Sequence, residues 1–169
     1  MLLIETETEI TASPNQVWHA LIDFPHYPEW NPFIAVRGTP GAGLDVEWSF
    51  GRLGRKRLWF PALITAHEEP ERLAWTFETG RAFDLEEVYT VRAAHGGTLL
   101  RHSLRCGGLL AVLGKPLLRK RMQAILSAAD SGLQRYLAVP AKAEAGSRSM
   151  SFRSSTRAAP SKRTQRKRR

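Results

Sequence analysis

The chain has 169 residues, a length that suits one domain able to bury roughly two-thirds of its unfolded surface. Its formal net charge of +9 is confined to residues 141–169, which hold ten Lys or Arg and one acid, whereas residues 1–140 hold fifteen of each. The single cysteine, Cys106, excludes an intrachain disulfide and forms no metal-binding pattern with the neighbouring histidines. The high isoelectric point therefore describes the C-terminal segment and not the domain.

The start of the sequence does not resemble a signal peptide. Its start, "MLLIETETEI", alternates apolar or Thr positions with Glu and lacks the charged-then-apolar layout of a signal peptide. No run approaches the ~20 apolar residues that a membrane-spanning helix needs. We therefore expect a soluble, cytoplasmic protein without a transmembrane segment.

The first expected elements are a strand and a short helix. In residues 2–11, apolar or Thr positions alternate with three glutamates, the pattern of a half-buried strand. Ser13 is a favourable N-cap, and Pro14 fits the first helical position, where its missing N–H costs nothing. Apolar residues at helical spacing give this helix one buried face, and Pro25 ends it.

The segment "DFPHYPEWNPF", residues 23–33, crowds three prolines and four aromatic residues together. The aromatic residues recur at every third position, which matches tight helical turns. The prolines exclude a long helix or a central strand. We expect this segment to close over the interior as a lid, its rings either contacting a ligand or simply capping the core.

Strand patterns occupy most of residues 44–106. In "LDVEWSF" the apolar residues from Leu44 to Phe50 share one face. Pro61, in the next strand pattern, indicates an edge position or a bulge. After a further strand over "LAWTFET", two long strand patterns flank "HGG", which predicts a hairpin turn.

The last expected element is a long helix. Gly114 and Pro116 interrupt its pattern, so the main helix begins near Pro116. Gly132 weakens this helix by about 1 kcal/mol relative to Ala, and we interpret it as the mark of a close packing contact. The apolar stripe, at steps of three and four, comprises Leu118, Met122, Ile125, Leu126, Ala129, Leu133 and Leu137.

This order predicts an α+β fold. A curved antiparallel sheet of six to seven strands wraps around a long C-terminal helix, and two short helices follow the first strand. One apolar stripe cannot cover the whole concave face of such a sheet. We therefore expect an apolar cavity between the sheet and the helix.

The order of elements, the segment "SPNQVWHALIDFPHYPEWNPF" and the closing helix resemble the START-like helix-grip superfamily. This group is also described as SRPBCC, or polyketide cyclase/dehydrase and lipid transport. The resemblance covers about residues 2–140 and is most specific between Pro14 and Pro32. It implies a START-like ligand-binding domain over residues 1–140, with a deep apolar cavity whose contents differ widely among members.

The residues expected to contact a ligand are those whose pattern turns them toward this cavity. We assign no catalytic residue, metal ligand or cofactor, because the sequence contains no Gly-rich phosphate loop, HExxH, GxSxG or CxxC. The predicted ligand set comprises Phe24, Tyr27, Trp30, Phe33, Trp48, Phe50, Trp75, Phe77, Tyr89, His102, Met122 and Leu126.

The hairpin register decides which residues surround His102. If residues 96–97 form a two-residue turn, Val91 faces His102 and Tyr89 faces Leu104, and the apolar residues of both strands share one face. His102 is then a polar residue among inward apolar ones. It either orients a ligand carbonyl, acts as an acid or base, or is satisfied by a backbone group or water.

Glu87 has the same parity as Tyr89. In this register it lies roughly 13 Å from the point that faces His102, so we expect no direct contact between the two. A buried carboxylate would need a partner, and we therefore expect a bulge to place Glu87 outside. The charged run around it is typical of a solvated strand face.

Residues 141–169 are rich in Ser, Arg and Lys and cannot bury enough apolar surface to fold. We interpret them as a disordered polybasic tail. Such a tail is either simply solvated or attaches to nucleic acid or to an anionic membrane by electrostatic attraction.

Three hypotheses for function follow from these patterns. The first is the binding or carriage of a small hydrophobic molecule, a lipid or aromatic metabolite, in the apolar cavity. The second, which the resemblance permits, is a cyclase- or dehydratase-type enzyme acting on a polyketide-like substrate. The third is an interaction protein whose basic tail binds acidic polymers or membranes.

Overall fold

The computed structural model describes residues 1–50, 57–78, 80, 82–109 and 115–138. The predicted tail at 141–169 therefore lies outside the described residues. The elements are β1 (Leu2–Ile10), α1 (Pro14–Ile22), the 3-10 turn η1 (Phe24–His26), α2 (Tyr27–Trp30), β2 (Ile34–Arg37), β3 (Asp45–Phe50), β4 (Phe60–Glu68), β5 (Arg72–Glu78), β6 (Asp84–Ala94), β7 (Gly97–Gly107) and α4 (Lys115–Ala138).

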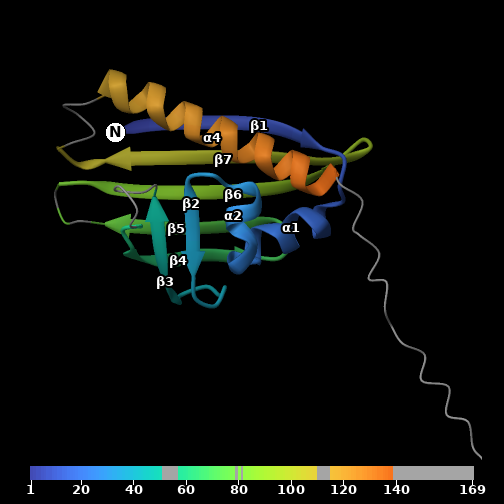
Figure 1. The fold of residues 1–169 in the computed structure, drawn as a ribbon, viewed down its shortest axis with the longest axis horizontal. Helices are drawn as coiled ribbons and strands as arrows, with labels where there is room; N and C mark the ends of the chain where they lie inside the picture. Colours follow the sequence, from blue (N-terminus) through green and yellow to red (C-terminus); the bar gives the residue numbers. More distant parts are fainter. Residues whose placement is uncertain (51–56, 79, 81, 110–114, 139–169) are drawn as a thin grey trace, which may run out of the picture.

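The strands form one antiparallel sheet in the order β1-β7-β6-β5-β4-β3-β2 (Figure 1). Each strand from β2 to β7 pairs with its neighbour in sequence, and β1 joins the far side of β7. The curled seven-stranded sheet, the two short helical segments after β1 and the long last helix confirm the predicted α+β helix-grip fold.

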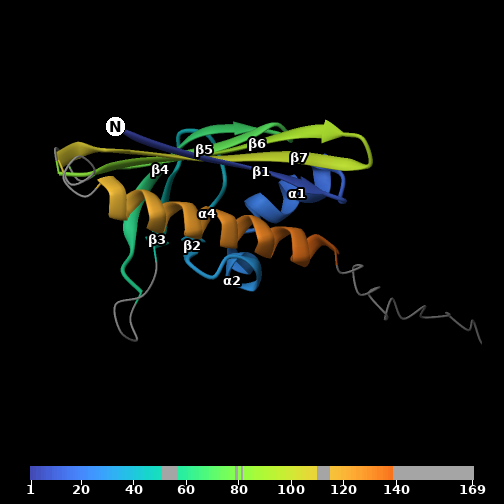
Figure 2. The ribbon, with the colours of Figure 1, turned by 90° about the horizontal axis from the view of Figure 1, so that it is seen from above.

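The helices lie together on one side of the sheet, as Figure 2 shows from above. The apolar stripe of α4 faces the sheet, with Met122, Leu126 and Leu133 buried. At Gly132 a Cβ would lie 1.9 Å from the carbonyl oxygen of Trp30, so only glycine lets α4 approach α2 this closely. The close contact predicted for Gly132 is confirmed.

The first helix begins as its sequence predicts. The Ser13 hydroxyl accepts a hydrogen bond from the Gln16 backbone N–H, and the Gln16 side chain accepts one from the Ser13 N–H. This reciprocal capping box satisfies two donors at the start of α1. The helix packs against the core through Val17, Trp18 and Leu21, which are fully buried.

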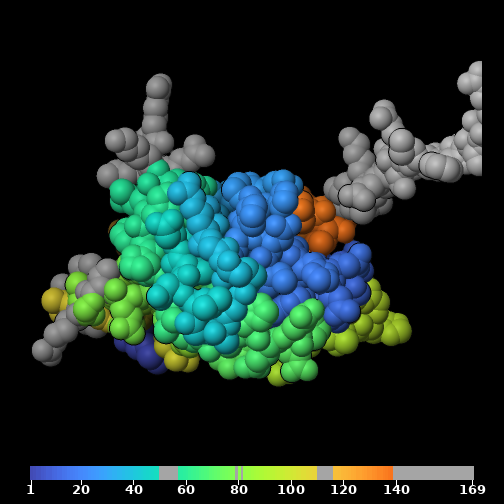
Figure 3. All heavy atoms as spheres, turned by 90° about the horizontal axis from the view of Figure 1, so that it is seen from below, coloured from blue at the N-terminus to red at the C-terminus, as the bar shows by residue number. Residues whose placement is uncertain are grey.

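The proline-rich segment folds into tight helical turns, η1 and α2, as its three-residue spacing predicts. Phe24, Tyr27 and Trp30 are buried, and the Tyr27 hydroxyl donates a hydrogen bond to the Leu21 carbonyl at 2.8 Å. In Figure 3 the segment from α1 to β3 forms a continuous covering over this side of the molecule. The rings thus pack inward beneath their own backbone.

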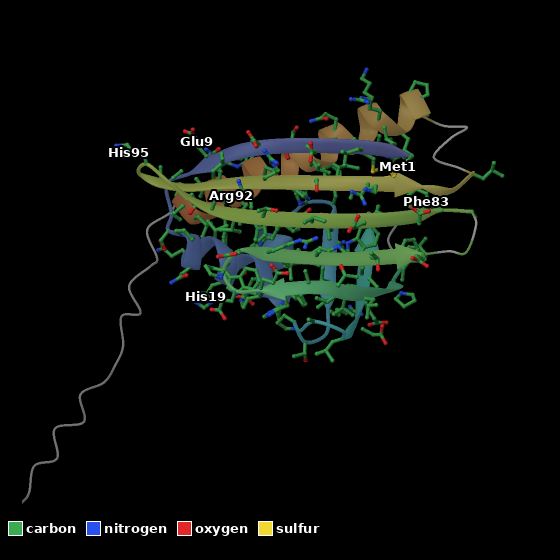
Figure 4. All side chains as sticks on the ribbon, turned by 180° about the vertical axis from the view of Figure 1, so that it is seen from behind. Met1, Glu9, His19, Phe83, Arg92 and His95 are labelled. Carbon is green, nitrogen blue, oxygen red and sulfur yellow. The ribbon has the colours of Figure 1, made fainter. Side chains whose placement is uncertain are left out.

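The β6–β7 hairpin turns at a different place from the one we predicted. Ala94 pairs with Gly97, so the turn residues are His95 and Gly96, and Gly96 has a φ of 85°. Figure 4 shows His95 at the tip of this hairpin, at the opposite end of the molecule from Met1. Gly97 is the first residue of β7, and a Cβ there would meet the Ile10 carbonyl oxygen at 2.1 Å, so the close approach of β1 requires glycine.

Two further strand predictions need correction. Pro61 was predicted at an edge position or a bulge, but β4 lies between β3 and β5 in the sheet, and the bulge of β4 is at Ile64/Ala66. Pro61 pairs with Glu47 of β3 and precedes Leu63, where the pairing with β5 begins, so its missing N–H interrupts no bond to β5. Leu44 was predicted to belong to this strand and to share a face with Val46 and Trp48. It precedes β3, and its side chain is 46% exposed, whereas Val46 and Trp48 are buried.

Candidate functional site

Six of the predicted ligand residues form a continuous chain of rings between the helices and the sheet. The Tyr27 ring lies 4.5 Å from Trp30, 5.7 Å from Phe24 and 6.4 Å from Trp75, measured between ring centroids. Trp75 continues the chain to Tyr89 at 5.7 Å, and Tyr89 stacks on the His102 imidazole at 4.1 Å. The lid is therefore in contact with the centre of the sheet.

The other predicted ligand residues surround this chain or lie outside it. Trp48 and Phe77 stack at 6.0 Å in a second group on β3 and β5. Met122 and Leu126 are buried on α4, and Phe33 is partly buried against the core. The backbone of Phe50 belongs to β3, but its side chain lies outside the described residues.

A buried polar cluster sits at the sheet end of the ring chain. The His102 Nε2 atom lies 2.9 Å from Glu87 Oε1, and its Nδ1 atom lies 2.8 Å from Asp130 Oδ1. Both Glu87 and His102 are 0% exposed, and Asp130 is 3% exposed. We call these three residues the Glu87–His102–Asp130 cluster; it joins β6, β7 and α4.

Neighbouring side chains also donate to the carboxyl oxygens of Glu87 and Asp130. The Trp75 indole N–H and the Tyr89 hydroxyl each donate to Glu87 at 2.9 Å, and the Thr6 hydroxyl donates to Asp130. Each carboxylate oxygen in the cluster thus has at least one donor. Such saturation is what a buried charged group requires.

The two carboxylates determine the protonation of the histidine. Burial lowers the pKa of His102, but the hydrogen bonds and negative charges of Asp130 and Glu87 outweigh burial and raise the pKa to about 9. Burial, reinforced by the charge of Glu87, raises the pKa of the Tyr89 hydroxyl well above its ordinary value. The cluster can therefore hold an imidazolium between two carboxylates, an arrangement capable of holding or moving a proton.

The observed register corrects our prediction for this hairpin. Tyr89 pairs with His102 and Glu87 with Leu104, so the predicted pairs of Val91 with His102 and Tyr89 with Leu104 are wrong. The prediction that Glu87 faces solvent and cannot reach His102 is also wrong. Glu87 is a diagonal neighbour of His102 across the strands, a distance that a long side chain spans.

Sequence reasoning did not identify Asp130 or Thr6 as part of this site. Asp130 is an acid on the buried side of α4, four residues after Leu126 and three before Leu133, and this placement is the signal that could have revealed it. Thr6 was correctly placed on the inward face of β1, but nothing in the sequence pairs β1 with the right part of β7.

Two adjacent residues of the lid have buried donors without a partner among the described residues. They are the Trp30 indole N–H and the Asn31 side-chain N–H₂. Asn31 is 0% exposed, and its side-chain oxygen is occupied because it accepts from the backbone N–H groups of Phe33 and Ile34. The Trp18 indole N–H is a further such donor.

Three pockets lined by described residues open to the surface. They have volumes of about 70, 470 and 310 Å³, and charged and apolar residues line them together. None of these three includes a member of the predicted ligand set, so the interior cavity stays a prediction. Within the described residues, no group of His, Cys, Asp or Glu is arranged to hold a metal ion, and no helix is long and apolar enough to span a membrane.

A family model described as "Polyketide cyclase / dehydrase and lipid transport" matches residues 1–138. The chain belongs to this family. The predicted resemblance is thereby confirmed. No curated protein matches the chain significantly.

Solved structures of similar fold support the same architecture. A protein of Thermus thermophilus is 17% identical with a TM-score of 0.67, covering 81% of this chain and 97% of that one. A START superfamily protein of Mycobacterium smegmatis is 20% identical with a TM-score of 0.65, covering 80% and 97%. A protein of the dynemicin biosynthetic locus is 17% identical with a TM-score of 0.65, covering 81% and 47%.

Proposed function

We propose that this domain binds a small hydrophobic molecule, a lipid or an aromatic metabolite, in the interior between the sheet and α4. The family description and the ring chain both support this proposal. Aromatic side chains offer large apolar contact areas to a flat or elongated guest. Tyr27 and Trp30, on the short helix α2, are the residues that would contact the guest from the lid side.

The observation that carries the proposal is the pair of unpartnered donors on the lid. A buried amide or indole N–H without an acceptor is destabilising, because it has lost its hydrogen bond to water. The Trp30 and Asn31 donors would both be satisfied by an oxygen atom of a bound molecule. The proposal therefore specifies a guest that carries at least one acceptor oxygen on an apolar frame.

The first experiment measures binding of prodan, a solvatochromic naphthyl ketone, to the full chain by its fluorescence shift. Prodan should bind, and Trp30→Phe, which keeps a ring but removes the donor, should weaken binding about fivefold. The matched control is Trp59→Phe. Trp59 lies under the Arg37 guanidinium, 3.8 Å from ring centroid to carbon, and borders a surface pocket, so its replacement should leave binding unchanged.

Two outcomes would count against the proposal. If prodan shows no shift with the wild-type chain, and native mass spectrometry of protein purified from its own cells finds no bound molecule, the domain is not a carrier of this kind. If Trp30→Phe and Trp59→Phe weaken binding equally, the lid donor has no role in recognition.

The Glu87–His102–Asp130 cluster favours a second candidate, acid–base catalysis on the bound molecule. An imidazole held between two carboxylates is a suitable proton donor or acceptor for a cyclase- or dehydratase-type reaction. His102 is the residue that would exchange the proton, with Asp130 orienting its ring. The test incubates the natural bound molecule, once identified, with wild type and His102→Ala; equal product formation would exclude His102.

A further inference from the structure

The cluster carries one more negative than positive charge. Both ring nitrogens of His102 lie within hydrogen-bond distance of a carboxyl oxygen, at 2.9 Å from Glu87 and 2.8 Å from Asp130. Two ionised carboxylates would each accept from one ring nitrogen, which makes the histidine an imidazolium, and a proton shifted onto either acid would leave the total charge of the cluster the same. One imidazolium and two carboxylates leave a net charge of −1 in the interior.

No buried cation balances this charge within the described part of the chain. The buried polar and charged residues there are Asn31, Ser49, Glu87, Thr98, His102 and Asp130, without a Lys or Arg. The nearest strand arginines, Arg101 and Arg105, are about half exposed on β7 and pair with glutamates of neighbouring strands. Solvent and salt screen those surface charges far more than the buried ones.

The excess charge lies beside the rings that we propose as the binding surface. Glu87 Oε2 accepts from the Trp75 indole at 2.9 Å. Trp75 contacts Tyr27, which in turn contacts Trp30, the residue with the unpartnered donor. A molecule bound against Trp30 is thus separated from the cluster by aromatic side chains and not by water.

We infer that the bound molecule is an uncharged, oxygen-bearing compound such as a ketone, ester or alcohol, and that the Glu87–His102–Asp130 cluster discriminates against carboxylates. This inference rests on the proposed function and adds the ligand class to it. The lid donors require an acceptor oxygen, and the buried negative charge disfavours an acceptor that is itself an anion. Free fatty acids and aromatic acids are therefore poor ligands.

The expected discrimination is measurable. Across about 10 Å at an effective dielectric constant of about 20, one excess charge weakens the binding of an anion by about tenfold. Moving any carboxylate into an apolar interior weakens binding as well, whatever charge lies nearby. The experiment must therefore separate the field of the cluster from simple desolvation.

Three naphthalene probes of the same ring and substitution position achieve this separation in the wild-type chain. They are acetylnaphthalene, which is neutral, naphthoate, an anion, and naphthylmethylammonium, a cation. Displacement of prodan near pH 6 gives each dissociation constant, with both ionic probes charged and His102 protonated. We expect the ketone to bind tightest, because it loses the least hydration energy on entering the interior. We expect the cation to bind more tightly than the anion, because both ions lose hydration but the negative charge of the cluster attracts only the cation.

Two isosteric variants then test whether the charge of the cluster causes the weaker binding of naphthoate. Asp130→Asn removes one buried negative charge, and the ratio of the naphthoate to acetylnaphthalene dissociation constants should fall about tenfold. The matched control is Glu7→Gln, which removes an exposed carboxylate paired with Arg101 on the outer face of the sheet. Its ratio should stay within about twofold of the wild-type ratio.

The outcomes separate this inference from the proposed function. If naphthoate binds the wild-type chain as tightly as the ketone or the ammonium probe, the inference is overturned and the binding function stands. If Asp130→Asn folds but keeps the wild-type ratio, the cluster is not the cause and the inference is again overturned. If Asp130→Asn does not fold, the order of the three dissociation constants for the wild-type chain decides whether the inference stands. If no probe binds, both the proposed function and the inference fail.

Discussion

His102 joins the two buried carboxyl groups of the Glu87–His102–Asp130 cluster. It contacts Glu87 on β6 and Asp130 on α4, and Tyr89 stacks on its ring. Removing one partner of a buried ion pair leaves uncompensated charge in a medium of low dielectric constant, which typically destabilises by about 3–5 kcal/mol. We predict that His102→Gln loses about 3 kcal/mol of unfolding free energy, measured by urea denaturation of the full chain.

The control for this prediction is the neighbouring residue on the same strand. Arg101 pairs with Glu7 at 2.7 Å, but both side chains are about half exposed. Exposed ion pairs contribute about 0–1 kcal/mol, so Arg101→Gln should be nearly neutral. Comparable losses in the two variants would show that the buried cluster has no special role in stability.

The raised pKa of His102 also predicts how stability changes with pH. Below pH 6.5 both the folded and unfolded states bind the proton, so the contribution of His102 is fully present. Between pH 6.5 and about 9 only the folded state keeps it, so unfolding free energy falls as pH rises, and above about 9 the contribution is gone. Urea denaturation from pH 6 to 9 should show this fall in wild type.

The variant His102→Gln isolates this titration. The hydrogen bond with Asp23 also raises the pKa of the exposed His26. The contribution of His26 to the unfolding free energy therefore also falls as pH rises, but it falls equally in wild type and in His102→Gln. The difference between wild type and His102→Gln should therefore shrink as pH rises. A difference that is constant over this range would mean that folding does not shift the pKa of His102, and a difference that grows with pH would mean that folding lowers it.

At the scale of residues, the sequence predicted faces more reliably than partners. The hairpin register was wrong by an even number of positions, so His102 and Tyr89 still face inward as predicted. The partners were wrong because adjacent glycines left the turn ambiguous, and it is the pairing of Gly97 with Ala94 that places Gly97 in the strand. The cluster could not be predicted without that register.

The contact between α2 and α4 shows how one residue determines the placement of an element. In a free helix, Gly132→Ala would stabilise by about 1 kcal/mol. Here the new methyl group would lie 1.9 Å from the Trp30 carbonyl oxygen, so α2 or α4 must move. Overpacking of this kind costs typically about 1–3 kcal/mol, and we predict a net loss of unfolding free energy.

The comparison variant is Ser131→Ala, the exposed position one residue earlier on α4. It receives the same side chain without a new contact, so urea denaturation should show a change of only a few tenths of a kcal/mol. Stabilisation by Gly132→Ala would contradict the close contact. Loss of prodan binding in a still-folded Gly132→Ala protein would instead connect this contact to the placement of the lid.

At the scale of elements, local signals predicted local structure well. The capping residues of α1, the turns of the lid and the stripe of α4 all depend on neighbours within four positions, and all are observed. The start of β3 was predicted too early because Leu44 fits the alternation but lies before the first paired residue. An alternating pattern does not show where the neighbouring strand stops pairing.

At the scale of the whole domain, the first strand is in contact with the last strand and the last helix. β1 pairs with β7 from Leu2 opposite Cys106 to Ile10 opposite Thr98. The Gln134 side chain on α4 donates to the Glu9 carbonyl at 2.9 Å. The inner face of the sheet is therefore covered only after segments far apart in the sequence have packed together. Few contacts of this face can form before the whole domain folds.

This arrangement predicts one cooperative unfolding transition for the domain. Trp18, Trp30, Trp48 and Trp75 are buried on α1, α2, β3 and β5, so tryptophan fluorescence samples the lid, the sheet edge and the sheet centre together. Far-UV circular dichroism samples all strands and α4. In urea, the two signals should share one midpoint and one m-value.

A fluorescence midpoint at lower urea than the dichroism midpoint would contradict this prediction. It would mean that the lid, the edge strand β2 and its neighbour β3 open before the rest, as a separate unit of lower stability. His102→Gln provides the critical comparison, because it removes the contacts that connect α4 to β6 and β7 but leaves the lid intact. If the domain unfolds as one unit, this variant lowers the fluorescence midpoint and the dichroism midpoint equally. The fluorescence midpoint should fall even though none of the four buried tryptophans donates a hydrogen bond to His102.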